Sequence, residues 1–345
     1  MKTLVVGNSL DVLPAIEHIH NAGGQAALFA TEGFLPYDRS LLPGLAGGDV
    51  RQEDLFRTSS DVLARCCPAV ITDESLGRIS VKRRHLTTVK KTQIDYDRLI
   101  LVDTGELILP AIRGRERKGV FDCWRLSSIK ALQQHLPFAD GVMVAATRIQ
   151  GLNMACVLNR LKKEVTVISS AIGLLPEILD DESGLLLKQI LEGKGIRVIS
   201  ENAVEEILGE AQVKAVKLKS GKVLGCDAVI FDEARADIRM LSEPALTGDD
   251  EICIEDCFKL PTPPLAPAHF GCHVLDGFYA GWTKLPDGGR EYLKFDGPQN
   301  IYKKIYALGH HLAGVVTFNA PQDNDRLLGI LQRQDNITGK EEEIL

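Results

Sequence analysis

The sequence has little that would tie it to a membrane, to nucleic acid or to an oxidising compartment. It has no apolar run of about 18 residues, the length that a helix needs to cross a bilayer. Its 40 lysines and arginines are outnumbered by 47 aspartates and glutamates, and the formal net charge of −7 argues against a basic surface for nucleic acid or anionic lipid. Met1-Lys2 leads directly into an apolar strand pattern, without a signal peptide. We therefore expect a cytoplasmic protein with no membrane span and no nucleic-acid partner.

The eight cysteines include no Cys-x-x-Cys pair and no short disulfide framework. They are Cys66, Cys67, Cys123, Cys156, Cys226, Cys253, Cys257 and Cys272. Cys253-x-x-x-Cys257, with Cys272 beyond, leaves a metal or iron–sulfur corner open, although this spacing matches no zinc or ferredoxin rule. Isolated cysteines more often pack in a core, so we expect no metal and no redox-active dithiol.

A buried strand that runs into a tight turn occurs twice, at residues 3–8 and 141–151. At such a turn a dinucleotide site carries G-x-G-x-x-G, whose glycines make the turn, admit the pyrophosphate and let the helix approach the strand. The glycine positions hold Gly7, Ser9 and Val12 in the first copy and Ala146, Arg148 and Gly151 in the second. The sequence therefore predicts two nucleotide-binding frameworks, each of which has lost most of its glycines.

Apolar spacing around the first turn predicts a parallel strand–helix–strand unit. The elements expected in this part are a strand at 3–7, a helix at 10–22, a strand at 26–29, a loop rich in proline and glycine at 33–49, a ribbon at 81–91 and a buried strand at 96–102. The second turn is followed by the same order of elements. They are a strand at 142–145, a helix at 152–161, a strand at 164–169, a helix at 176–191, strands at 195–200 and 213–218 that continue the sheet, and a strand at 228–231 that closes it.

The remaining third of the chain has a different character. Residues 261–268 are rich in proline and predict a linker. Residues 301–308 and 312–318 predict a hairpin around Gly309-His310-His311, where two solvated histidines are a simpler explanation than a ligand pair. Residues 324–334 predict an amphipathic helix, and residues 337–345 a mobile tail.

Four segments carry a resemblance to a known family. They lie at 34–47, which contains Pro36-Tyr37-Asp38-Arg39, at 96–105, which ends in Asp103-Thr104-Gly105, at 164–176 and at 302–316. In these segments the chain resembles the FAD-dependent pyridine nucleotide-disulfide oxidoreductases, in the branch of the NADH:rubredoxin reductases and the N-terminal part of assimilatory nitrite reductases. The resemblance covers nearly the whole chain.

The resemblance implies an α/β fold with two Rossmann-like domains, an FAD-type domain and an NAD-type domain inserted in it, plus a small α+β C-terminal interface domain. The expected boundaries are 1–113 for the FAD-type domain, 114–232 for the inserted NAD(P)-type domain, 233–265 for a truncated return to the FAD-type domain, 266–336 for the interface domain and 337–345 for the tail.

The resemblance also implies cofactor contacts. The matching positions are Gly7, Glu32, Arg39, Thr104 and Gly105 for FAD and Gly151 for NAD(P). The alternative is that these are inherited fold residues, with Gly7 needed for a turn and Arg39 paired with a loop carboxylate. The residues alone therefore leave open whether the chain binds FAD. We expect NAD(P) not to bind, because Arg148 at the second turn blocks the approach of the phosphates more often than it attracts them.

Several departures from the family pattern add negative charge or remove contacts. Asp11 places a carboxylate where phosphates would lie against a helix N-terminus, which repels them. Asp232-Glu233-Ala234 replaces a Gly-x-Gly, Ser169 replaces a ribose-binding acid, and Gly44 stands where relatives often carry a lysine. The Gly-Asp segment that binds the ribityl chain is not found beyond Leu260.

These departures favour a non-catalytic or strongly reduced member, a pseudoenzyme that serves as a structural or regulatory subunit of a redox complex. Such a subunit would dock on a flavin or iron–sulfur protein and could form an oligomer. The alternative is an active FAD-dependent NAD(P)H oxidoreductase that passes electrons to rubredoxin or another small iron–sulfur acceptor.

Overall fold

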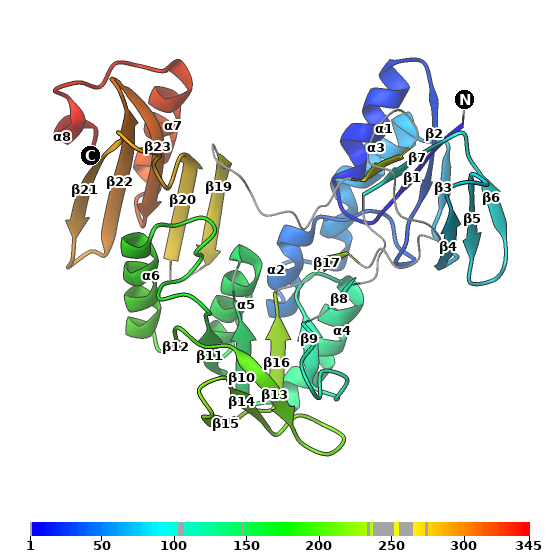
Figure 1. Ribbon diagram of the computed structural model, residues 1–345, viewed down its shortest axis with the longest axis horizontal. Coiled ribbons are helices and arrows are strands. Elements are labelled where there is room, and N and C mark those ends of the chain that lie inside the picture. Colours follow the sequence, from blue (N-terminus) through cyan, green and yellow to red (C-terminus); the bar gives the residue numbers. More distant parts are fainter. Residues whose placement is uncertain are drawn as a thin grey trace. The chain divides into compact units, whose positions relative to one another are not determined.

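The structure is a computed structural model that describes residues 2–102, 107–108, 110–146, 148–232, 235–236, 252–254, 265–272 and 275–345. The chain divides into two compact units (Figure 1). Unit 1 contains Met1–Pro110, Trp124–Lys130 and Ala234–Lys259, and unit 2 contains Ala111–Cys123, Ala131–Glu233 and Leu260–Leu345. None of the helices in the described ranges is long and apolar enough to cross a membrane.

Unit 1 is built on a parallel sheet of five strands in the order β18-β7-β1-β2-β3. These strands are β1 (Lys2–Val6), β2 (Gln25–Phe29), β3 (Ala69–Ile71), β7 (Arg98–Leu101) and β18 (Ile252–Ile254). The edge strand β18 comes from the part of the chain that follows the NAD-type segment. The FAD-type sheet is therefore completed after an insertion, in agreement with the expected topology.

Helices cover one face of this sheet and a β-ribbon covers the other (Figure 1). The helices of unit 1 are α1 (Val12–Asn21), α2 (Leu42–Gly47), α3 (Arg57–Cys66), the 3₁₀ turns η1 (Arg39–Leu41) and η2 (Gln52–Phe56), and the first part of α4 (Leu126–His135). Val5, Ile16 and Leu63 form the core under α1 and α3, because alternate strand residues and the i, i+3, i+4 residues of α1 face each other.

The ribbon on the opposite face is an antiparallel sheet of β4 (Leu76–Ser80), β5 (His85–Thr88) and β6 (Gln93–Asp95). It contributes Ile79 and Leu86 to a second core with Leu4 and Phe29. Two short strands, β8 (Leu107–Ile108) and β17 (Arg235–Ala236), pair with each other in the same unit.

Unit 2 begins with a second parallel sheet, in the order β12-β11-β10-β16-β9. Its strands are β9 (Val120–Asp122), β10 (Gly141–Ala145), β11 (Glu164–Ile168), β12 (Arg197–Ile199) and β16 (Ala228–Phe231). The helical elements beside it are α5 (Ile149–Arg160), α6 (Asp181–Gly193), the rest of α4 and the 3₁₀ turn η3 (Leu136–Phe138). Both α/β sheets thus repeat the strand–turn–helix arrangement that the two turns predict.

Three expectations for this sheet were wrong. Residues 213–218 do not continue it, because β14 (Ala215–Leu218) pairs antiparallel with β13 (Val204–Leu208) and β15 (Val223–Gly225) in a separate sheet. The strand at 228–231 does not close it either, since β9 lies beyond β16 at the edge. The helix expected from residue 176 begins at Asp181, where the Asp180 side chain accepts a hydrogen bond from Ser183 N at 2.8 Å and caps the helix.

The C-terminal part of unit 2 is an antiparallel sheet in the order β19-β20-β23-β22-β21. Its strands are β19 (Leu265–Cys272), β20 (Leu275–Gly281), β21 (Arg290–Asp296), β22 (Ile301–Leu308) and β23 (His311–Phe318). The predicted hairpin is confirmed, with a turn at Gly309-His310 and His311 already in β23. The predicted helix is α7 (Pro321–Arg333), which begins three residues earlier than the pattern indicates.

The expectation of a mobile C-terminal tail was wrong. Residues Glu341–Ile344 form the short helix α8, and Ile344 and Leu345 are each only 7% exposed. Both pack in one apolar cluster with Leu327 of α7 and Ile305 of β22. The segment is ordered because burying two large apolar side chains outweighs the entropy of so short a stretch.

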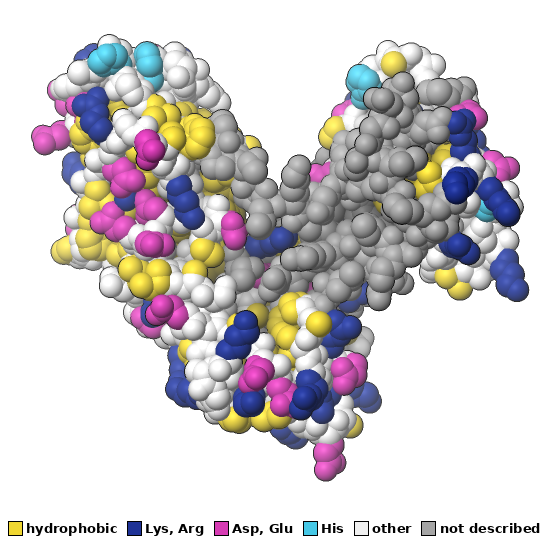
Figure 2. Space-filling view, in the orientation of Figure 1, with side chains coloured by type: hydrophobic (Ala, Val, Ile, Leu, Met, Phe, Trp, Pro, Cys, Tyr) yellow, Lys and Arg dark blue, Asp and Glu magenta, His cyan; other side chains and the backbone are white. Residues whose placement is uncertain are grey.

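An ionic cluster joins α6 to the C-terminal sheet within unit 2. Lys304 of β22 is 3% exposed, and its Nζ lies 2.8 Å from carboxylate oxygens of Asp180, Glu182 and Glu291. Tyr306 Oη donates to Asp180 Oδ2 at 2.6 Å. Acidic side chains are exposed over α6 and the C-terminal sheet on the side seen in Figure 2. The buried lysine thus fixes the start of α6 on the sheet.

Candidate nucleotide sites

The turn after β1 keeps the one glycine that its backbone requires. Gly7 has φ of +154°, in the region that residues with a Cβ rarely adopt, and its N–H donates to Phe29 O at 3.1 Å. The next residue, Asn8, is fully buried and joins the turn to the loop after β2. Its Oδ1 accepts from Glu32 N at 2.7 Å, and its Nδ2 donates to Phe34 O at 2.7 Å. The side chain of Asn8 therefore holds the two loops of the FAD-type edge together.

Glu32 lies just after β2 and forms a buried network with Tyr37 and Arg39. Tyr37 Oη donates to Glu32 Oε2 at 2.8 Å, and Arg39 Nη2 lies 3.2 Å from Glu32 Oε1. The side chains of Arg39 and Glu32 are only 8% and 6% exposed. Tyr37 Oη also accepts from Leu126 N, the first amide of α4, at 2.9 Å. Burial, and then the Glu32 charge, raise the pKa of Tyr37 well above its usual value.

The start of α1 carries a carboxylate of its own. Asp11 is the residue before the helix, and its Oδ2 accepts from Ser9 Oγ at 2.6 Å. Val12, at the third glycine position, is fully buried in the core between α1 and the sheet. The glycine that would allow close helix packing has therefore been replaced by a side chain that contributes to the core.

The second turn, after β10, is occupied differently. Asp232 follows β16, is fully buried, and its Oδ2 accepts from Arg148 N at 2.7 Å, at the residue that precedes α5. A Cβ added at Gly151 would lie 2.4 Å from Asp232 Oδ2. Gly151 is therefore required here for the approach of a carboxylate of the same chain to the first turn of α5.

Other residues around the second turn are engaged within the protein. Ser169 Oγ donates to Gly173 O at 2.8 Å and accepts from Ala171 N at 3.2 Å, so it closes its own loop. Cys123 is fully buried, and burial followed by the charges of Asp232 and Asp122 raises the pKa of its thiol well above the usual value. A thiol in this state is unreactive.

The structure brings together some of the predicted cofactor residues. Gly7, Glu32 and Arg39 lie beyond the carboxyl ends of strands β1 and β2 in unit 1, whereas Gly151 belongs to unit 2. Thr104 and Gly105 lie outside the described residues. The bonding of Arg39 to Glu32 is what the inherited-fold alternative predicted, and the role of these residues as cofactor ligands stays a prediction.

Sequence reasoning missed Asn8, Tyr37 and the contact made by Asp232. In the sequence, Asn8 could have been noticed as an amide directly after Gly7 in the turn. Tyr37 could have been noticed from its place in the 34–47 motif. Asp232 was noted only as a lost glycine. Its position at the start of α5 depends on the parallel pairing of β16 with β10, which brings the ends of the two strands together.

No group of three or more His, Cys, Asp or Glu side chains in the described ranges is arranged to hold a metal ion. Cys66, Cys67, Cys123, Cys156 and Cys226 are buried thiols that form no disulfide. The expected packing role of Cys253, Cys257 and Cys272 concerns side chains outside those that the structure describes.

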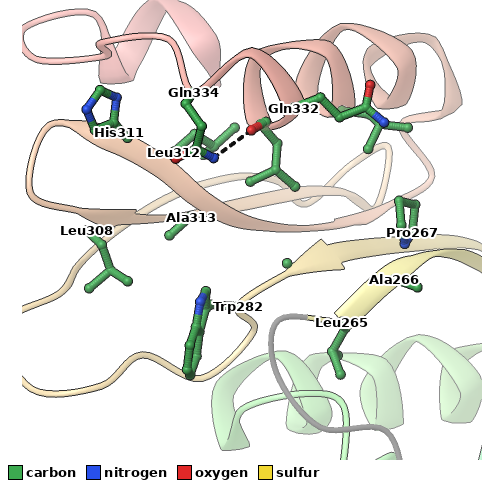
Figure 3. A pocket seen from close by; sticks show the side chains of 13 residues that line it. Leu265, Ala266, Pro267, Trp282, Leu308, His311, Leu312, Ala313, Gln332 and Gln334 are labelled. Atoms are coloured by element: carbon green, nitrogen blue, oxygen red, sulfur yellow. Dashed lines mark hydrogen bonds between the residues drawn. The ribbon is translucent and has the colours of Figure 1, made fainter.

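A pocket of about 520 Å³ lies in the C-terminal domain, away from both turns in the sequence (Figure 3). Leu312 and Leu331 line it together with Trp282, and His311 and Gln332 stand among the polar groups. Its described lining includes no lysine, arginine, aspartate or glutamate, so it offers no charge to a nucleotide phosphate.

Comparison with known proteins points to one family. The model of the family described as pyridine nucleotide-disulphide oxidoreductase matches residues 1–233. The assimilatory nitrate reductase electron transfer subunit of Bacillus subtilis is 21% identical over 391 residues, covering 100% of this chain and 51% of that protein. The nitrite reductase [NAD(P)H] of the same organism is 24% identical over 384 residues, covering 97% of this chain and 48% of that protein. The chain therefore spans about half the length of these curated relatives.

A solved structure shows the same fold. The covalent putidaredoxin reductase–putidaredoxin complex matches with a TM-score of 0.79 at 16% identity, covering 99% of this chain and 97% of the other. At this identity the likeness establishes the architecture, two Rossmann-like domains with a β-rich C-terminal domain, and not the activity.

Proposed function

We propose that this chain, which belongs to the pyridine nucleotide-disulphide oxidoreductase family, is a FAD-dependent NAD(P)H oxidoreductase that passes electrons to a small iron–sulfur protein such as rubredoxin. The observation that carries this proposal is the position of Glu32 directly after β2 and beside the turn at Gly7, where a Rossmann unit places its ribose-binding acid and where Tyr37 and Arg39 hold the carboxylate. Relatives named as an electron transfer subunit and as a reductase bound to its redox partner support the acceptor class.

The FAD-type edge fits a flavin dinucleotide. An acid that follows the second strand of a Rossmann unit is the group that hydrogen-bonds a ribose hydroxyl, and Glu32 stands at that point. Arg39 holds the carboxylate in one orientation, and Tyr37 ties it to the start of α4. When bound, a flavin supplies the two-electron to one-electron conversion that such a reductase needs. The residues of this chain supply only its orientation and its electrostatic environment.

The NAD-type edge fits a pyrophosphate poorly. A phosphate at the start of α5 would compete with Asp232 for the N–H of Arg148, and the two anions would repel each other. We therefore expect weak NAD(P)H binding and derive no step through the nicotinamide. The expectation from the sequence that NAD(P) does not bind becomes, in this proposal, low affinity.

The carboxylate of Asp232 at the start of α5 also favours a second function. If Asp232 at α5 and Asp11 at α1 together prevent nucleotide binding, the chain is a non-catalytic subunit of a redox complex, in agreement with the main expectation from the sequence. The family relationship supports the active reductase more than this alternative, because family membership brings both nucleotide-binding domains.

The test is retention of flavin by the purified chain. The protein is incubated with excess FAD, desalted, examined for the two flavin absorbance bands and titrated anaerobically with NADH. Bands that survive desalting and bleach with NADH support the reductase. A spectrum without flavin after desalting overturns it in favour of the non-catalytic subunit, and a stable flavin that NADH never reduces rejects the NAD(P)H-dependent step.

A matched pair of variants tests the carrying observation. Arg39→Met should raise the Kd for FAD about tenfold or more, because it leaves the buried Glu32 carboxylate without its guanidinium partner. Arg51→Met is the control, since the Arg51 side chain is 71% exposed and pairs with the neighbouring acids Glu53 and Asp54. Equal FAD affinity in the two variants would mean that the network has no part in flavin binding.

A further inference from the structure

The C-terminal sheet departs from regular pairing at one point, beside the pocket of Figure 3. β20 ends at Gly281, whose φ of +71° lies in the left-handed region that favours glycine. Next to it β23 shifts register against β22, which leaves Ala313 as the extra residue of a bulge. The N–H of Trp282 donates to Ala313 O at 2.9 Å, and a Cβ added at Gly314 would overlap the Trp282 carbonyl. The close approach that these two glycines allow fixes the backbone of Trp282 beside the bulge.

The pocket formed there, which we call the Trp282 pocket, has the size of a small-molecule site. Its volume of about 520 Å³ falls within the range of about 300–1,000 Å³ that is usual for ligand pockets. In Figure 3, Trp282 and Leu308 lie on one side of it, and Gln332 and Gln334 lie on the other, at the end of α7. The apolar lining residues that are only half-buried are Trp282, Leu308, Ala313, Leu328 and Leu331. Apolar surface that is gathered in a hollow and left in contact with water is typical of a ligand site.

The polar groups of the Trp282 pocket are hydrogen-bonding groups without formal charge. The indole N–H of Trp282 makes no hydrogen bond to any residue that the structure describes. Gln334 Nε2 donates to Leu331 O at 2.8 Å, which leaves the side-chain oxygen of Gln334 as an acceptor. His311 and Gln332 are both exposed and add an imidazole and a second amide. The pocket can therefore donate to, and accept from, a ligand that carries an oxygen.

The lining selects against a charged ligand. Among its described residues there is no lysine, arginine, aspartate or glutamate. Arg333 follows Gln332 in the chain, but its Nη2 lies 2.8 Å from Asp335 Oδ2 and is engaged there. An ion that entered the pocket would lose hydration without gaining a partner of opposite charge. A neutral aromatic ring would instead gain apolar contact and could stack on the indole of Trp282.

We propose that the Trp282 pocket binds an uncharged aromatic molecule that carries a hydroxyl or carbonyl oxygen. The ring lies against Trp282 and the half-buried leucines, and the oxygen accepts a hydrogen bond from the indole N–H. The inference is independent of the proposed function, because it uses only residues of the C-terminal domain.

Equilibrium dialysis of the full chain against two matched probes tests the ligand class. The probes are 2-naphthol and 2-naphthoate, which share the two rings and differ in carrying a hydroxyl or a carboxylate. We expect saturable binding of 2-naphthol with a Kd of about 100 μM, and binding of 2-naphthoate that is about tenfold weaker or more. Equal affinity for the two probes overturns the proposal. So does the absence of saturable 2-naphthol binding up to about 1 mM, the result expected if a segment of a partner protein occupies the pocket.

A filling variant tests the location of the site. Ala313→Leu adds bulk at the bulge and should raise the Kd for 2-naphthol about tenfold or more, because the new side chain takes up part of the pocket. Ala69→Leu is the matched control, since Ala69 is exposed on β3 of unit 1, and should change the Kd less than about twofold. Thermal unfolding of both variants shows that each is folded. Equal Kd values for the two variants would place the bound naphthol elsewhere and reject the assignment.

The two tryptophans of the chain provide a second pair that does not alter the volume of the bulge. Trp282→Phe keeps an aromatic ring but removes the indole N–H, and should raise the Kd for 2-naphthol about fivefold. Trp124→Phe makes the same change in unit 1 and should leave the Kd within about twofold of the wild-type value. A Trp282→Phe variant that binds 2-naphthol as tightly as Trp124→Phe would remove Trp282 from the site and overturn the proposal.

Discussion

The turn after β1 and the turn after β10 share one pattern and each keeps one of its three glycines, Gly7 in the first and Gly151 in the second, but the protein has filled the lost positions in different ways. At the first turn a neutral side chain, Asn8, bridges two loops of its own sheet edge, and the acidic Asp11 stays exposed. At the second turn Asp232, which is distant in sequence, delivers a buried carboxylate to the start of α5. At the first turn the amides at the start of α1 bond to neighbouring residues, Asp11 N to Ser9 Oγ and Leu13 N to Leu10 O. At the second turn the partner is a carboxylate that is distant in sequence.

The largest expected effect tests how closely the second turn is built. Gly151→Ala should lower the free energy of unfolding by about 2–3 kcal/mol, because the new Cβ would overlap Asp232 and displace its carboxylate from Arg148 N. Gly193→Ala is the control, since a Cβ there meets nothing within 4 Å and alanine favours the helix. Urea unfolding of both variants gives the comparison. Equal stability of the two would show that the start of α5 tolerates a side chain.

The first turn should depend on Asn8 almost as strongly. Asn8→Ala should cost about 2 kcal/mol, because it removes a fully buried amide and the N–H of Glu32 and the carbonyl of Phe34 both lose a partner. Asn21→Ala, at the exposed end of α1, should change stability by less than about 0.5 kcal/mol. If Asn8→Ala proves as stable as Asn21→Ala, water replaces the amide and the two loops are not held by it.

The strands and helices around both turns could be predicted because their apolar periodicity is local. The buried pattern of residues 3–7 and 10–22 needs no distant partner to be recognised. Residues 213–218 show the limit. Their alternation indicates a strand, but only the pairing with β13 and β15 decides which sheet receives it.

The contacts of the candidate site were less predictable for the same reason. Glu32 and Arg39 could be selected from a motif, but their bond to each other forms only when the loop folds back on β2. Asp232 is separated from Arg148 by 84 residues, and its role follows from sheet order alone. The tail was misjudged because the apolar Ile344 and Leu345 at its end received too little weight against the three preceding acids.

Neutralising the acid at each turn, in two separate variants, should change the affinity for a different nucleotide in each case. Asp232→Asn should tighten NADH binding about tenfold, because it removes a buried charge from the place of the pyrophosphate. Asp11→Asn should tighten FAD only about twofold to threefold, since Asp11 is exposed and its charge is screened. Titration of each variant with both nucleotides measures the pattern. An NADH affinity that Asp232→Asn leaves unchanged would remove the argument that this carboxylate competes with phosphate.

The smallest expected effect is at the start of α6, where Asp180 is a carboxylate in the ordinary N-cap position. Burial raises the pKa of Asp180, but hydrogen bonds from Lys304, Tyr306 and Ser183 N outweigh it, so the pKa lies below its usual value. Because the pKa is lowered in the folded state, the Asp180 carboxylate stabilises the fold at pH values above its unfolded-state pKa of about 3.9. This contribution is lost as the pH falls through the pKa of the folded state.

Asp180→Asn keeps the cap but not the charge. Its deficit in free energy of unfolding should be present near pH 7 and shrink below about pH 4. A deficit that does not change with pH would mean that the start of α6 depends on the cap alone. The carboxylate of Asp232 at α5 could then owe its place to hydrogen bonding in the same way.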